Sequence, residues 1–184
     1  MTLSLVKLTR LIEGCASREL IVALNPVGDA GTTAGRDKKR MADIRHVTDL
    51  FAVAPQVEAG DFAAIAALGY GTVINNRPDS EAPGQLSSVD AEAAAVAAGL
   101  VYVHAPFTGS PTEAAIARLS AALDGDTGPV LAYCRSGTRS ISAWALVEAE
   151  SGRLDTNAIV EKAHAAGYDL SPMRGLLRSR SVKA

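Results

Sequence analysis

The sequence has few aromatic residues, few cysteines and no long apolar run. Phe, Trp and Tyr make up 4% of its 184 residues, and two residues are cysteines. Two cysteines far apart in the chain provide no disulfide framework, and a free thiol suits a reducing compartment such as the cytoplasm. No apolar run approaches the roughly 20 residues that span a bilayer. The composition therefore excludes a disulfide-stapled scaffold and predicts no membrane partner.

Charge is sparse and nearly balanced. Charged residues make up 21% of the chain, and the formal net charge is −2. A nucleic-acid-binding domain carries a basic stripe or patch, which this sequence lacks, so we expect no nucleic-acid partner. With 48% hydrophobic residues, a chain of this length can bury one substantial core. The pattern predicts a single domain and leaves the oligomeric state open.

The amino-terminal stretch differs from the rest of the sequence. Residues 28–40 are rich in small and polar residues, which is typical of a linker. We interpret residues 1–40 as a flexible extension or linker and residues 41–180 as the folded domain, with Met41 as its natural start.

Within the domain, predicted strands and helices alternate. Such an order is typical of a single α/β domain with a mostly parallel sheet flanked by helices. The predicted strands cover residues 50–53, 72–75, 101–104 and 129–133, and the predicted helices cover residues 60–68, 88–98, 111–123, 140–150, 156–166 and 171–178.

One cysteine lies where a protein can make a reactive thiolate. Cys134 follows the apolar strand 129–133 and precedes the predicted helix 140–150. Backbone N–H groups of such a loop, with the positive end of the helix dipole, form a cradle for an anion. The alternative is an inert cysteine at the end of a buried strand, and Cys15, which has no such setting, is interpreted as incidental.

The loop around Cys134 supplies the predicted site. We expect Cys134 to act as the nucleophile and Arg139 to hold an anionic group. The neighbouring loop residues and two polar residues after the strand 72–75 are predicted to bind the anion; they are Arg135, Ser136, Gly137, Thr138, Ser140, Arg77 and Asp79. Arg77, Asp79 and Glu81 could equally form a solvated turn. Neither a metal nor an organic cofactor is predicted.

The spacing of the loop favours sulfur chemistry. Cysteine-dependent protein phosphatases use Cys-x5-Arg, whereas this sequence has Cys-x4-Arg, with Tyr133 before the cysteine. The shorter loop resembles that of rhodanese-type sulfurtransferases, whose cysteine carries sulfur as a persulfide. A tighter loop suits a single sulfur atom better than a tetrahedral phosphoryl group.

Two further segments point to a family. Residues 72–81 read as a strand that runs into a polar turn, and residues 102–109 as a strand with a following loop. With the cysteine loop, they resemble the bacterial family called beta-lactamase hydrolase-like protein, phosphatase-like domain, over about residues 41–177. The resemblance implies a dual-specificity-phosphatase-like fold. Members are variously described as phosphatases or as rhodanese-like sulfur transferases linked to sulfide detoxification.

In phosphatases of that fold, an Asp in the loop after the strand that matches residues 101–105 protonates the departing alkoxide. Here the loop 106–110 holds no carboxylate, and general acid catalysis is worth about 10²–10⁴-fold. The sequence thus predicts a sulfurtransferase that moves sulfur from a small anionic donor to a thiol, sulfite or cyanide acceptor through a persulfide on Cys134. The alternatives are a cysteine-dependent phosphatase, with Asp79 or Glu81 as the acid, and an inactive anion-binding module.

Overall fold

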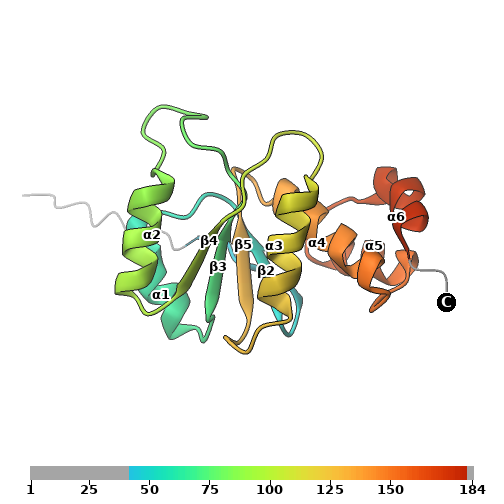
Figure 1. The fold of residues 1–184 in the computed structure, drawn as a ribbon, viewed down its shortest axis with the longest axis horizontal. Helices are drawn as coiled ribbons and strands as arrows, with labels where there is room; N and C mark the ends of the chain where they lie inside the picture. The colour runs from blue at the N-terminus through green and yellow to red at the C-terminus, as the bar shows by residue number, and fades with distance from the viewer. Residues whose placement is uncertain (1–41, 182–184) are drawn as a thin grey trace, which may run out of the picture. The chain divides into compact units, whose positions relative to one another are not determined.

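The computed structural model describes residues 42–181, which form a five-stranded sheet with helices on both faces (Figure 1). The strand order is β1-β2-β5-β3-β4. Four neighbours in this order, β2, β5, β3 and β4, are parallel, and β1 is antiparallel to β2. The strands are β1 Arg45–Thr48, β2 Phe51–Ala54, β3 Thr72–Asn75, β4 Val101–His104 and β5 Val130–Tyr133.

Alternation along the central strands divides the core into two clusters. Side chains of successive strand residues point to opposite faces. In β2, Phe51 and Val53 pack into one cluster, whereas Ala52 and Ala54 pack into the other. Because both faces of the central strands are buried, β2 and β5 are continuous apolar runs with no polar alternation.

The helices cover both faces of the sheet. Helices α1 (Phe62–Ala67) and α2 (Ser88–Ala97) contribute to one cluster. On the other face lie α3 (Glu113–Leu123), α4 (Thr138–Ser151), α5 (Thr156–Ala165) and α6 (Arg174–Arg180). Two short 3₁₀ turns, Ala59–Asp61 and Ser171–Met173, precede α1 and α6.

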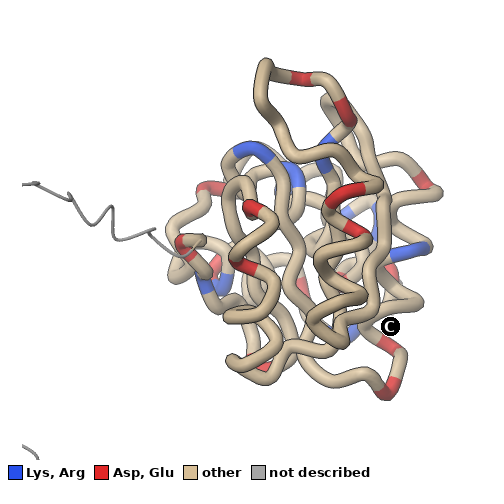
Figure 2. The backbone as a smooth tube through the Cα atoms, turned by 90° about the vertical axis from the view of Figure 1, so that its left-hand side faces the viewer, with Lys and Arg blue, Asp and Glu red and all other residues tan. Residues whose placement is uncertain are grey.

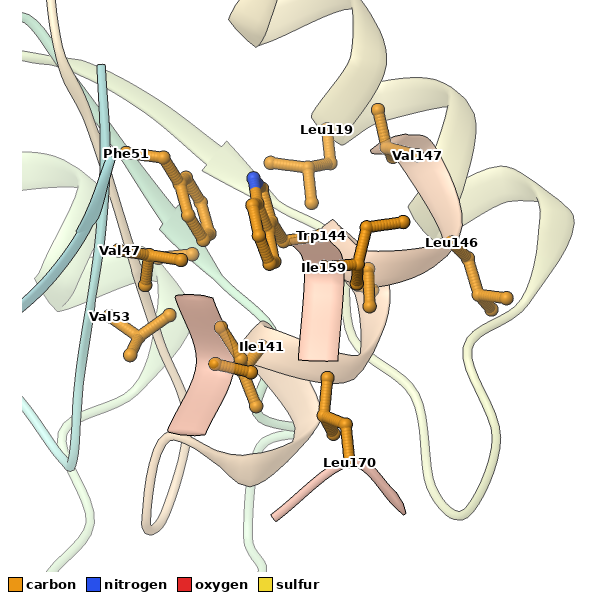
Figure 3. Close-up of a cluster of buried hydrophobic side chains, with 14 of the residues drawn as sticks. Val47, Phe51, Val53, Leu119, Ile141, Trp144, Leu146, Val147, Ile159 and Leu170 are labelled. Carbon is orange, nitrogen blue, oxygen red and sulfur yellow. The ribbon is translucent and has the colours of Figure 1, made fainter. Parts of the chain in front are cut away.

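A ring pair anchors the larger cluster. Trp144 of α4 stacks on Phe51 of β2, with ring centroids 5.8 Å apart and planes 7° from parallel (Figure 3). Ile141 and Ile159 lie close to this pair in the same cluster. Helix α4 is therefore held against the sheet along its buried face.

The predicted α/β fold and its alternation of elements are confirmed. Strand β1 escaped prediction, because its sequence Arg-His-Val-Thr is short and mostly polar and lies at the edge of the sheet. Helix α3 begins at Glu113 and not at residue 111, since the Thr112 hydroxyl accepts the Ala115 N–H as an N-cap. The proposed extension 1–40 lies outside the described residues, so the domain boundary stays a prediction.

The described domain shows neither a one-sided charge distribution nor a membrane-spanning helix. Basic and acidic positions are interspersed over the described part of the chain (Figure 2). Within residues 42–181, no helix combines the length and apolarity needed to cross a membrane.

Candidate active site

Cys134 lies at the carboxyl end of β5, where the chain turns into α4. Its side chain is 1% exposed, and its Sγ accepts a hydrogen bond from the Gly137 N–H at 3.1 Å. Helix α4 starts directly after Gly137, so the loop is confined to residues 134–137. The thiol therefore faces the backbone N–H groups at the amino end of a 14-residue helix, whose dipole favours an anion.

The loop turns sharply at Gly137. This glycine has φ +89°, in the left-handed region that penalises a side chain. A Cβ there would lie 2.0 Å from the Tyr168 hydroxyl oxygen. That hydroxyl donates to the Ser136 carbonyl at 3.2 Å, and the Arg45 guanidinium carbon lies 5.2 Å from the Tyr168 ring centroid. Tyr168, which sequence reasoning missed, thus braces the loop from the turn after α5.

Arg139 lies in the first turn of α4 and is held by two loops. Its Nη1 donates to the Phe107 carbonyl at 3.0 Å, in the loop after β4. Its Nη1 and Nη2 each lie 2.8 Å from one oxygen of Glu81, which forms a bidentate pair. Burial lowers the pKa of Arg139, but Glu81 and the nearby Cys134 outweigh burial and raise it.

Glu81 also bridges to a second arginine. Arg77, 5% exposed, donates from Nε to Glu81 Oε2 at 2.8 Å and from Nη1 to Gln56 Oε1 at 2.6 Å. The Arg139 guanidinium and then Arg77 hold the pKa of Glu81 below its usual value, although partial burial opposes this. Two loops that follow different strands thereby meet at one carboxylate, as the carboxyl edge of a parallel sheet allows.

Asp79 lies apart from this arginine pair. Its Oδ1 accepts the Ser88 N–H at 2.8 Å, and its Oδ2 accepts the Ser88 hydroxyl at 2.5 Å. These hydrogen bonds lower the pKa of Asp79. The carboxylate therefore stabilises the start of α2, and among the described residues it is not a partner of Arg139.

The other predicted loop residues differ in their exposure to solvent. Arg135, Ser136 and Thr138 are exposed, and the Ser136 and Thr138 hydroxyl oxygens lie 3.2 Å apart. Ser140 is fully buried, and its Oγ has no hydrogen-bond partner among the residues that the structure describes.

Comparison with known proteins decides the family. Residues 43–151 match the family described as beta-lactamase hydrolase-like protein, phosphatase-like domain. The chain belongs to this family.

The curated relatives of this phosphatase-like domain are longer proteins. A beta-lactamase hydrolase-like protein of Xylella fastidiosa strain Temecula1 is 35% identical over 138 residues, which are 74% of this chain and 32% of that protein. The chain thus spans about a third of the length of the curated relatives that it matches.

Solved structures share the fold of this phosphatase-like domain. A candidate phosphatase from Neisseria meningitidis is 31% identical, with a TM-score of 0.64 over 74% of this chain and 97% of that one. Kinase associated phosphatase, at 12% identity, matches 77% of this chain and 95% of its own with a TM-score of 0.60. The predicted dual-specificity-phosphatase-like fold is therefore confirmed.

The predicted sulfurtransferase function is wrong. The family carries a phosphatase-like domain, and the relative of known structure at 31% identity is a candidate phosphatase. The sulfur donor and the thiol acceptor were predicted only as its substrates, so they are not proposed for this domain.

Both observations behind the sulfur-transfer prediction are compatible with a phosphatase site. The short Cys-x4-Arg spacing still brings Arg139 to the site, because Gly137 lets α4 begin at once. The loop 106–110 supplies a carbonyl and no carboxylate, but Glu81 reaches Arg139 from the loop between β3 and α2. Within residues 42–181, no group of three or more His, Cys, Asp or Glu could hold a metal ion.

Proposed function

We propose that this domain is a cysteine-dependent phosphatase. The observation that carries the proposal is the Gly137 N–H on Cys134 Sγ at the start of the helix that also bears Arg139. This arrangement places a nucleophile, backbone N–H donors and a guanidinium around one position, as phosphoryl transfer needs.

The reaction has two displacement steps. Cys134 Sγ attacks phosphorus, the bond from phosphorus to the leaving oxygen breaks, and its electron pair goes to that oxygen. Water then attacks the phosphocysteine, and the S–P bond breaks to return the thiolate and release phosphate. Arg139 and the N–H groups of the loop bind the other phosphoryl oxygens in both steps.

The substrate class is a small phosphomonoester. We place its phosphoryl group against residues 134–140, with no metal ion or organic cofactor. We also place the protein in the cytoplasm, because a free reactive thiol persists in a reducing compartment.

Turnover of p-nitrophenyl phosphate tests the proposal. Cys134→Ser should lower kcat at least about 10³-fold, because the nucleophile is lost. Cys15→Ser, which changes the other cysteine in the sequence, should retain wild-type turnover. Mass spectrometry of acid-quenched wild type should show one phosphoryl group on the peptide that contains Cys134.

Anion binding without turnover would contradict the proposal. Inorganic phosphate or vanadate that binds wild type and Cys134→Ser equally, without turnover or phosphocysteine, would make the domain an anion-binding module.

A further inference from the structure

The loop 106–110, where phosphatases of this fold carry the acid that protonates the leaving oxygen, holds no carboxylate. The loop 106–110, which follows β4, meets the site through the Phe107 carbonyl, which accepts from Arg139. Glu113, the next carboxylate along the chain, is paired with Arg180 in α6. A phosphoester with a basic leaving group needs an acid, so the acid must come from another element.

Glu81 is the carboxylate that lies on the anion-binding arginine. Its two oxygens pair with the two terminal nitrogens of Arg139, each at 2.8 Å. This is the bidentate geometry that an Arg fork also offers to two phosphoryl oxygens. In this state the carboxylate occupies the place that a phosphoryl group would take on the guanidinium.

The backbone before Glu81 is held in an unusual conformation. Ser80 has φ +63°, and among the described residues it is the one non-glycine residue with positive φ. Such a conformation costs of order 1–3 kcal/mol and tends to persist at functional sites. Glu81 itself is anchored by Arg77 Nε at 2.8 Å, so it stays near the site when Arg139 changes partner.

Substrate binding changes the charge around Glu81. A phosphoryl dianion that takes the Arg139 fork removes the main cation that keeps Glu81 ionised and places negative oxygens beside it. Loss of a cation and gain of a nearby anion both favour the protonated carboxyl. Arg77 stays on Oε2 and still favours the ionised form, so the proton would go to Oε1, the oxygen that Arg139 Nη1 releases.

We infer that Glu81 is a catalytic residue, the general acid of the phosphatase reaction proposed above. As the Sγ–P bond forms and the P–O bond breaks, the leaving oxygen takes the proton of the Glu81 carboxyl. In the second step, the Glu81 carboxylate accepts a proton from the attacking water as the O–P bond forms and the S–P bond breaks. The inference rests on the proposed phosphatase function.

Two other titratable groups near this loop are already engaged. Both Asp79 oxygens accept hydrogen bonds from Ser88. His104 Nε2 lies 3.1 Å from the Arg77 carbonyl oxygen. Neither group contacts the Arg139 guanidinium among the described residues, which leaves Glu81 as the donor.

Leaving-group dependence tests the inference. Glu81→Gln keeps the size and polarity of the side chain but cannot give up a proton. With phenyl phosphate, whose leaving group is basic, the variant should lose about 10²-fold or more in kcat. With p-nitrophenyl phosphate, whose leaving group departs easily, the loss should stay below about tenfold. The limb of the kcat–pH profile that reports the acid should disappear.

Three comparisons make the test decisive. Glu113→Gln, the same change at an exposed carboxylate of α3, should behave as wild type. The inference would be overturned by equal losses of Glu81→Gln on both esters. It would also be overturned if Asp79→Asn, and not Glu81→Gln, lost much more activity on phenyl phosphate than on p-nitrophenyl phosphate. Retained vanadate binding would show that the Glu81→Gln site is folded.

Absence of any turnover by wild type would refute the phosphatase function itself, which is a separate result.

Discussion

At the scale of single residues, the cradle around the thiol depends on a missing side chain. Gly137→Ala places a Cβ in a left-handed conformation and against the Tyr168 hydroxyl. We expect this variant to lose phosphatase turnover and to be destabilised by more than the roughly 1–2 kcal/mol of backbone strain alone. Urea unfolding followed by fluorescence measures the second effect.

The other end of the same helix provides the control for that change. Gly152 follows α4 with φ +69°, and no atom lies within 4 Å of its Cβ position. Gly152→Ala should therefore cost about 1–2 kcal/mol and leave turnover intact. Equal destabilisation by both changes would show that Tyr168 does not press on the loop.

Arg139 depends on the shape of its side chain as well as its charge. Arg139→Lys keeps the charge but loses the planar fork, so two parallel hydrogen bonds to the phosphoryl group become one. We expect about a 10²-fold loss in kcat/KM on p-nitrophenyl phosphate. The same change at Arg153, which pairs with Asp124 and Glu148, should have no effect on turnover. Similar kinetics for Arg139→Lys and wild type would show that Arg139 does not bind the phosphoryl group through its planar fork.

At the scale of elements, α4 joins the anion cradle to the core. Its first turn carries Arg139, and its next turns bury Trp144 against Phe51. Trp144→Ala should cost about 3–5 kcal/mol in the free energy of unfolding, through lost burial and the cavity left behind. Val89→Ala on α2, where the side chain is 72% exposed, should change stability by less than about 0.5 kcal/mol. Chemical denaturation monitored by circular dichroism compares the two.

Elements with strong local signals were the ones that the sequence could predict. The buried strands β2 and β5 are apolar runs, β3 is rich in β-branched residues, and the Cys134 loop is a local motif between a strand and a helix. Strand β1 and the brace from Tyr168 had no such signal, since an edge strand can be polar and Tyr168 acts through a contact between distant residues. The function prediction was wrong because the short loop and the lack of a carboxylate in residues 106–110 outweighed the alternative acid Glu81. The contact of Glu81 with Arg139 joins residues far apart in the sequence, which a local motif does not reveal.

At the scale of the whole molecule, the Glu81 ion pairs make stability depend on pH. Pairing with Arg139 and Arg77 lowers the folded-state pKa of Glu81 from its ordinary 4.5. Its contribution is therefore fully present above that ordinary value and is lost as pH falls through the lowered one. From about pH 7 to about pH 3, wild type should lose more unfolding free energy than Glu81→Gln, as urea titrations at each pH would measure.

An exposed glutamate serves as the reference for this comparison. Glu92→Gln changes a solvent-exposed side chain on α2 and should leave the pH dependence of wild type unchanged. If Glu81→Gln follows the wild-type curve as well, the ion pairs do not contribute to acid stability.

The brace from Tyr168 predicts how much of the chain the site needs. The family match ends at residue 151, before α5, α6 and Tyr168. A fragment cut at that boundary would keep the nucleophile, its arginine and both loops above the sheet. It would lack the hydroxyl that bonds to the Ser136 carbonyl and two of the four helices that cover one face of the sheet. During synthesis, the loop around Cys134 would therefore gain its brace only after the chain has passed Tyr168, beyond the segment that matches the family.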